Sequence, residues 1–287
     1  MTKFANKVAV ITGGARGIGL EAALELARGG ASIAIADRKI ELAEAAANRC
    51  RATGVDAAAF LMDQSAADSV AECISRISEK FGHLDLLFAN AGTGKFAPLV
   101  DMKKEDWDNI IQINLSGTFY VCQEVARRMI EQGKGGKIVL TASSGAAVVC
   151  DQLGAYCASK AGVMMLMKHL AAELGNYRIN VNAILPGVIA TGMTAAMLNQ
   201  EELRNMLIRQ TPVGRWGQPS EVAKLVAFLL SEDASYINGE GIMIDGGSAL
   251  HGFPRWYSLD YTKQNECDWN GLHDEYPYKK CSDRFDA

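Results

Sequence analysis

Tyr156 and Lys160 stand one helical turn apart in the stretch AYCASKAG, residues 155–162. Positions four apart share a face of an α-helix, so the phenol and the ammonium would lie side by side. Such a pair has two interpretations: an ordinary surface pair, or a proton donor with the charge that tunes it. The stretch by itself favours the surface pair, so the other motifs must decide between the two.

A glycine-rich turn, TGGARGIG, occupies residues 12–19, between an apolar run and an amphipathic stretch. Gly13, Gly17 and Gly19 allow a sharp turn and a close approach of the backbone to a pyrophosphate. A helix that starts here would direct its free N–H groups at the anion. No Gly-Lys-Ser/Thr sequence follows, so the turn is not a P-loop. Its position predicts a dinucleotide site and not a purely structural turn.

Two carboxylates follow the next two apolar runs. Asp37 ends the run 31–37, where it can accept both ribose hydroxyls of an adenosine and repel a 2′-phosphate. It therefore predicts NAD(H) over NADP(H), although Arg38 comes next. Asp63 ends the run 56–63, where a carboxylate can accept a hydrogen bond from the adenine amino group. The alternatives are a helix-capping role for Asp37 and a loop role for Asp63.

Strand-like and helix-like segments alternate along the chain, and they position these groups. Short apolar runs predict strands and amphipathic stretches predict helices, including a long helix around residues 107–132. This alternation predicts an α/β fold, a doubly wound parallel sheet with helices on both faces. Residues 1–249 are predicted as one Rossmann-type domain and residues 250–287 as a C-terminal extension. The seven predicted strands are residues 7–12, 31–37, 56–63, 84–92, 136–143, 178–185 and 241–247.

Composition excludes several classes of protein. Of 287 residues, 49% are hydrophobic and 22% charged, the net charge is -4, and no Lys/Arg-rich run occurs. We therefore expect no nucleic-acid or membrane partner. No apolar run reaches the ~18 residues that span a bilayer, and no signal peptide is visible, so we expect a cytoplasmic protein. Seven cysteines without paired spacing are expected as thiols, and we expect no metal site, because Cys267, His273 and Cys281 match no zinc pattern.

The motifs in combination resemble the short-chain dehydrogenase/reductase family, in the branch with TGxxxGxG and YxxxK motifs. The resemblance covers about residues 5–249 and rests on TGGARGIG, NAG at 90–92, INLSG, TASSG, YCASK, PGVIAT at 186–191 and DGG at 245–247. It implies that Tyr156 is the catalytic acid/base and that Lys160 binds the nicotinamide ribose. It also implies that Ser143 hydrogen-bonds the reacting oxygen, with Ser144 as the register alternative, and that Asn114 kinks its helix and holds a relay water.

The resemblance also implies a nicotinamide cofactor, which we expect to be NAD. A neighbouring ammonium and the positive nicotinamide ring should lower the pKa of the Tyr156 phenol below its ordinary value near ~10. Thr191 should fix the nicotinamide carboxamide. The expected cofactor-binding residues are Gly13, Arg16, Gly17, Ile18, Gly19, Asp37, Arg38, Asp63, Asn90, Ala91, Gly92, Tyr156, Lys160, Pro186, Gly187, Ile189 and Thr191.

Three segments are expected near the substrate by family architecture: the residues after Ser143, the loop after the fourth strand, and the segment after Pro186. Their side chains are mostly apolar, and methionines adapt their shape. This favours an apolar or cyclic secondary alcohol or ketone over a polyol, although these methionines could instead only pack against the protein. The expected substrate residues are Ser143, Val149, Leu153, Tyr156, Met193 and Met197.

Three alternative functions stay open: a polyol or sugar dehydrogenase, a 3-oxoacyl carrier-protein reductase, and a non-catalytic NADH sensor. The family implies a homotetramer, with a homodimer as the alternative. The extension 250–287 holds two Trp, four Tyr and two Phe, whereas disordered tails are poor in aromatics. We therefore expect it to pack at a subunit interface, with His251, Phe253 or Trp256 near a substrate pocket.

Overall fold

The computed structural model describes residues 3–250 of the chain. These residues fall in one compact unit. The expected contacts of His251, Phe253 and Trp256, and the role proposed for the extension as a whole, lie outside the described residues.

Within residues 3–250, seven strands form one sheet in which all neighbours run parallel, in the order β3-β2-β1-β4-β5-β6-β7. The α/β fold and the doubly wound, seven-stranded parallel sheet are thus confirmed. The strand order reverses between β1 and β4, and such a switch point opens a crevice at the carboxyl ends of the strands. The strands are β1 (Val8–Thr12), β2 (Ser32–Asp37), β3 (Ala57–Leu61), β4 (Leu86–Ala89), β5 (Gly136–Thr141), β6 (Ile179–Pro186) and β7 (Gly241–Ile244).

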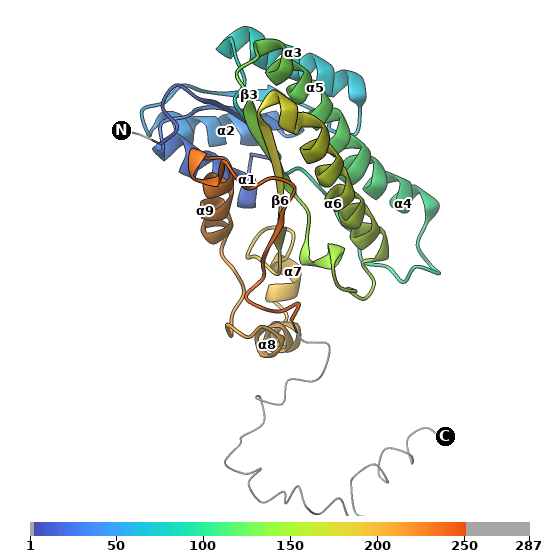
Figure 1. Cartoon of the computed structure of the whole chain (residues 1–287). Helices are drawn as coiled ribbons and strands as arrows, with labels where there is room; N and C mark the ends of the chain where they lie inside the picture. The colour runs from blue at the N-terminus through green and yellow to red at the C-terminus, as the bar shows by residue number, and fades with distance from the viewer. Residues whose placement is uncertain (1–2, 251–287) are drawn as a thin grey trace, which may run out of the picture. The chain divides into compact units, whose positions relative to one another are not determined.

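Helices cover both faces of the sheet (Figure 1). One face carries α1 (Gly17–Arg28), α2 (Ile40–Arg51) and α9 (Pro219–Leu229), and the other α3 (Ala67–Phe81), α5 (Gly117–Gln132) and α6 (Gly154–Leu174). Alternate strand residues feed two separate cores, so Ile33 and Ile35 face α1 while Ala34 and Ala36 face α3. Burial on both sides explains why the strands read as continuous apolar runs.

The shorter helices lie around the crevice. The helix α4 (Lys104–Ile111) precedes α5, and α7 (Ala195–Leu198) and α8 (Glu201–Gln210) follow β6 past its carboxyl end (Figure 1). No helix of the described part is long and apolar enough to cross a membrane.

The long helix expected around 107–132 is interrupted. It consists of α4, a π-helical turn over Gln112–Ser116, and α5. Single π-helical turns occur often at functional sites, because they displace a side chain without ending the helix. This one carries Asn114, whose side chain is fully buried and whose carbonyl accepts a hydrogen bond from Thr118 Oγ1 at 2.7 Å.

Candidate active site

A cavity of about 490 Å³ opens at the carboxyl ends of the strands, beside the switch point. Its wall combines the glycine-rich turn, the residues that follow β2 to β5, the start of α6 and the segment after β6. Segments far apart in sequence therefore meet here, as expected for a doubly wound sheet. The predicted site residues in the wall are Gly13, Arg16, Gly17, Ile18, Asp37, Arg38, Asp63, Asn90, Ala91, Gly92, Ser143, Tyr156, Lys160, Pro186, Gly187, Ile189, Thr191 and Met193.

The glycines of the glycine-rich turn bring bare backbone to the cavity. Gly13 has φ +63°, and a Cβ there would stand 2.9 Å from the Cα of Ala91. A Cβ on Gly19 would collide with the carbonyl oxygen of Gly13. Asn90 ties the turn to β4, because its Nδ2 donates to the carbonyls of Thr12 and Gly13, each at 3.2 Å. A side chain would fill this cradle, whereas bare backbone beside a helix N-terminus fits a diphosphate.

Asp37 lies in the cavity wall and does not cap helix α2. Its Oδ2 accepts a hydrogen bond from the Ala15 amide at 3.3 Å and its Oδ1 one from the Lys39 amide at 3.0 Å, while the residue also lines the cavity. Asp63 lies two residues past the end of β3 and not in the strand as expected. Hydrogen bonds from the Ser65 hydroxyl and amide, at 2.7 and 2.9 Å, hold the pKa of Asp63 below its ordinary value.

Lys160 is a buried residue, so the surface-pair interpretation of Tyr156 and Lys160 is wrong. Its relative exposure is 3%, its Nζ donates to the carbonyl of Thr141 at 2.7 Å, and the same Nζ lies 5.8 Å from the centroid of the Tyr156 ring. Burial disfavours the ammonium and lowers the pKa of Lys160 to about 8. A lysine of this kind can exchange a proton near neutral pH.

Within the protein alone, the pKa of the Tyr156 phenol is raised, whereas the expected decrease also depends on the positive nicotinamide ring. Burial raises the pKa of Tyr156, and a hydrogen bond with Ser143 opposes that increase only in part. Desolvation penalises the phenolate more than the nearby groups of the protein stabilise it. Ser143 lines the cavity next to the phenol, whereas Ser144, the register alternative, begins the short 3₁₀ turn behind it and is absent from the wall.

Asn114 lies behind the cavity wall, at the centre of a network that the sequence did not reveal. Its Nδ2 donates to the Thr93 carbonyl at 2.8 Å and to Ser159 Oγ at 3.0 Å, and its Oδ1 accepts from the Thr93 amide at 2.8 Å. Ser159 in turn donates to the carbonyl of Tyr156 at 2.7 Å. The π-turn is thereby fixed to both the loop after β4 and the helix that carries Tyr156 and Lys160.

The residues predicted to contact substrate are only partly brought together. Met193 joins Ser143 and Tyr156 in the wall, and it is 59% exposed. Val149 is 90% exposed and does not line the cavity. Leu153 and Met197 are also absent from the wall, as is Gly19, which supports the glycine-rich turn from behind.

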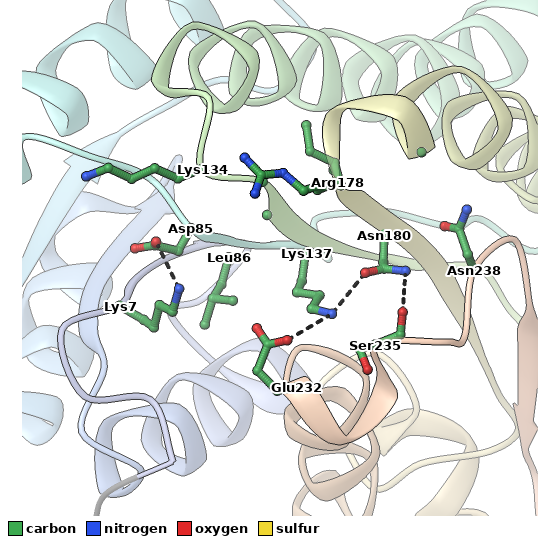
Figure 2. A pocket seen from close by; sticks show the side chains of 14 residues that line it. Lys7, Asp85, Leu86, Lys134, Lys137, Arg178, Asn180, Glu232, Ser235 and Asn238 are labelled. Atoms are coloured by element: carbon green, nitrogen blue, oxygen red, sulfur yellow. Dashed lines mark hydrogen bonds and ion pairs between the residues drawn. The ribbon is translucent and has the colours of Figure 1, made fainter.

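A second cavity, of about 460 Å³, lies at the opposite edge of the sheet, where β1, β4, β5 and β6 begin (Figure 2). Several of its charged groups are paired: Lys7 Nζ lies 3.4 Å from Asp85 Oδ1, and Lys137 Nζ lies 3.7 Å from Glu232 Oε2. Lys137 also donates to Asn180 Oδ1 at 2.9 Å. None of the residues that the motifs single out lines this cavity, so the chemistry belongs to the first one.

Sequence comparison finds relatives over most of the chain. The model of a protein family described as enoyl-(acyl carrier protein) reductase matches residues 13–249. The chain is 36% identical over 239 residues to gluconate 5-dehydrogenase of Gluconobacter oxydans (strain 621H), covering 83% of the chain and 93% of that protein. It is 41% identical over 245 residues to D-threitol dehydrogenase of Mycolicibacterium smegmatis, covering 85% and 94%. It is 39% identical over 244 residues to 3-oxoacyl-(acyl-carrier-protein) reductase of Staphylococcus epidermidis, covering 84% and 98%.

Solved structures share the whole fold. A short-chain type dehydrogenase/reductase from Mycobacterium marinum has a TM-score of 0.83 at 33% identity, covering 86% of this chain and 97% of that one. An NAD⁺-bound xylitol dehydrogenase has a TM-score of 0.81 at 34% identity, covering 85% and 100%. A gluconate 5-dehydrogenase from Burkholderia cenocepacia J2315, in complex with NADP and tartrate, has a TM-score of 0.83 at 35% identity, covering 87% and 98%.

Proposed function

The chain belongs to the short-chain dehydrogenase/reductase family, and from this premise we propose that it is an NAD-dependent enzyme that interconverts a secondary alcohol and a ketone. The observation that carries the proposal is the buried Lys160 beside the half-buried Tyr156, next to Ser143, at the end of a cavity whose other wall includes the glycine-rich turn. Such a cavity accommodates a dinucleotide, and the tyrosine and serine offer a site for one substrate oxygen.

The residues of the cavity divide between the parts of the cofactor. The backbone of Gly13 and Gly17 would hold the diphosphate, and Asp37 the adenosine ribose. Lys160 would hold the second ribose, and Thr191 the carboxamide. When bound, the nicotinamide accepts or supplies a hydride.

Side chains of the protein would carry out the proton transfer. During oxidation, Tyr156 Oη would take the proton of the substrate hydroxyl while Ser143 Oγ holds the same oxygen in place. Burial keeps the phenol protonated, which suits it to donate a proton to a ketone. Oxidation needs the phenolate, which the nearby ammonium of Lys160 and a positive cofactor ring favour. Asn114 would hold the water through which Lys160 exchanges protons with solvent.

Asp37 supports NAD as the cofactor, because its carboxylate faces the cavity where a 2′-phosphate would have to lie. Structural relatives exist with NAD⁺ and with NADP, so family membership alone leaves both open. Arg38 also lines the cavity, but its guanidinium follows a carboxylate that repels the phosphate.

Two loops beside the site support an apolar or cyclic substrate. The Ala97 amide donates to the Gln152 carbonyl at 2.8 Å and joins the loop after β4 to the loop after β5. Met193, from the segment after β6, lines the cavity together with Tyr156. This segment and the two loops leave several large apolar side chains exposed. They are Phe96, Leu99, Val148, Val149 and Met193.

Relatives that act on gluconate and threitol favour the alternative, a polyol or sugar dehydrogenase. A 3-oxoacyl carrier-protein reductase is a second alternative, supported by 39% identity to such an enzyme over nearly its full length. A non-catalytic NADH sensor is the third. The family also supports residues 1–249 as the catalytic domain, a homotetramer or homodimer, and a cytoplasmic location.

A substrate panel tests the proposal. Purified protein is incubated with NAD⁺, and separately with NADP⁺, and with cyclic apolar alcohols, polyols and a 3-hydroxyacyl thioester, while the absorbance of the reduced cofactor is followed. We expect turnover of cyclic apolar alcohols with NAD⁺. Turnover of polyols alone would contradict the substrate class, and turnover of the thioester with NADP⁺ alone would favour the carrier-protein reductase. Tight NADH binding without any turnover would favour the sensor.

A further inference from the structure

Gln64 follows Asp63 in the loop between β3 and α3, and its side chain points into the protein instead of into solvent. The residue is 6% exposed. Its Nε2 donates to the carbonyl of Ala91 at 3.2 Å and to the carbonyl of Ile113 at 3.0 Å. Both N–H groups of the Gln64 amide thus donate to backbone carbonyls, and the two carbonyls lie 22 residues apart in the sequence.

The two segments are the ones that Asn114 also joins. Ala91 belongs to the loop after β4 that lines the cofactor cavity, and Ile113 precedes Asn114 on the π-turn. Asn114 bonds Thr93 in the same loop through both of its amide atoms. The buried side-chain amides of Gln64 and Asn114 therefore both bridge this loop and the π-turn. Of the two residues, only Asn114 is implied in catalysis.

Further contacts hold the loop of Gln64 against the π-turn. Gln112 Nε2 donates to the carbonyl of Ser65 at 2.8 Å. Gly117, at the start of α5, packs so closely that a Cβ there would collide with the carbonyl oxygen of Gln64 and stand 2.7 Å from its Cγ. Since Asp63 is held by Ser65, the loop that faces the adenosine end of the cavity is continuous with the support of Asn114.

The amide oxygen of Gln64, Oε1, indicates that the side chain stabilises the site only through its two donated hydrogen bonds. This oxygen is buried without a hydrogen-bond partner, alone in this respect among the side-chain atoms of residues 3–250. A buried, unpaired acceptor is destabilising, and an apolar side chain of equal length would fill the same space without it. The amide gains only its two donated hydrogen bonds in return.

We propose that Gln64 is a positioning residue, which holds the π-turn and the loop after β4 in register so that Asn114 stays in place behind Lys160. This inference rests on the proposed function, because it assigns Gln64 to the proton relay of that reaction. A displacement of Asn114 by a fraction of an ångström would interrupt the relay, whereas the glycine-rich turn is held separately by Asn90.

The test compares Gln64→Met and Gln64→Glu with a matched control, Gln132→Met. Both Gln64 variants keep the length of the side chain. Gln64→Met loses both donors, and Gln64→Glu keeps at most the single O–H of the protonated acid. The side-chain amide of Gln132 also bonds to backbone, but at the opposite edge of the sheet. Its Oε1 accepts from the Leu84 amide at 2.9 Å, and its Nε2 donates to the Leu84 carbonyl at 2.8 Å. The readouts are NADH affinity, kcat, the solvent deuterium isotope effect on kcat, and hydrogen exchange of peptides that cover residues 110–118.

We expect both Gln64 variants to lose about tenfold or more in kcat with NADH affinity nearly unchanged, because a misplaced group slows chemistry more than binding. Their solvent isotope effect should increase, and exchange at 110–118 should accelerate. Gln132→Met should change none of these. Unaltered exchange at 110–118, or an equal loss of kcat in Gln132→Met, would overturn the assignment. Hydrogen exchange tests the assignment even if the wild-type protein oxidises nothing in the panel, in which case the proposed function alone fails.

Discussion

Asp37→Asn should relax the choice between NAD and NADP. Asp37 lines the cavity, and both of its carboxylate oxygens accept backbone amides, from Ala15 and from Lys39. Asparagine keeps one acceptor oxygen and nearly the same shape, but removes the negative charge. Arg38 in the cavity wall then becomes free to attract a 2′-phosphate without an adjacent carboxylate.

The size of the effect follows from Coulomb's law. Two unit charges 4 Å apart repel each other by about 4 kcal/mol at an effective dielectric near 20 and by about 1 kcal/mol in water. Asp37 is half-buried at the edge of an open cavity, so a value of about 1–3 kcal/mol is appropriate. This corresponds to about a 5- to 150-fold change in the NAD/NADP ratio of kcat/KM.

The assay measures kcat/KM for both cofactors with one alcohol substrate, in the wild type, in Asp37→Asn and in Asp63→Asn. Asp63 also lines the cavity, at the expected adenine end, so its substitution should weaken both cofactors alike and leave their ratio unchanged. A wild type that prefers NADP, or an Asp37→Asn variant with the wild-type ratio, would refute the role of Asp37.

Three further predictions concern stability, cofactor binding and assembly. Burial lowers the pKa of Lys160 from 10.5 to about 8, so its desolvation destabilises the fold fully below pH 8 and less as the pH rises toward 10.5. Lys160→Met should therefore be inactive yet raise the free energy of unfolding by about 1–3 kcal/mol at pH 7, with a gain that shrinks above pH 8 in urea titrations; a gain independent of pH would contradict this. Gly19→Ala should weaken NADH binding at least about tenfold in fluorescence titrations, because the new Cβ collides with the Gly13 carbonyl, and wild-type affinity would count against it. Deleting residues 252–287 should change the assembly state in light scattering and raise the substrate KM, whereas no change in either would remove the proposed role of the extension.

Most of the architecture could be predicted from the sequence because its signals are local. Each strand begins and ends within about three residues of its predicted bounds, and the largest differences are at carboxyl ends, where the last predicted residues of β3, β4, β5 and β7 belong to loops. The glycine-rich turn could be located for the same reason, since Gly13 needs a positive φ that few other residues adopt. Burial of Lys160 was not visible in its own motif, but it follows from the position of α6 against the sheet.

The features that escaped prediction depend on contacts between distant segments. Gln64 and Ser159 reach partners 27 to 49 residues away, and nothing in the neighbouring sequence marks them. The π-turn was expected only as the kink that the resemblance assigns to Asn114, and not from the pattern of the residues around it. The pKa of Tyr156 is raised by burial, and burial cannot be predicted from the four-residue spacing between Tyr156 and Lys160. Val149 lies in an apolar stretch, yet the loop turns its side chain outward.

The role of Tyr156 is measured by single-turnover reduction, by prebound NADH in Tyr156→Phe, of the ketone that corresponds to an alcohol oxidised in the panel. Tyr177→Phe is the matched control, because Tyr177 lies in the turn between α6 and β6, away from the cavity wall, and is 49% exposed. The account predicts that Tyr156→Phe binds NADH nearly as the wild type does and loses about 10²- to 10⁴-fold of the rate, as expected when an acid/base group is removed. Tyr177→Phe should match the wild type. A Tyr156→Phe variant that reduces the ketone at the wild-type rate would contradict the assignment of Tyr156 as the proton donor.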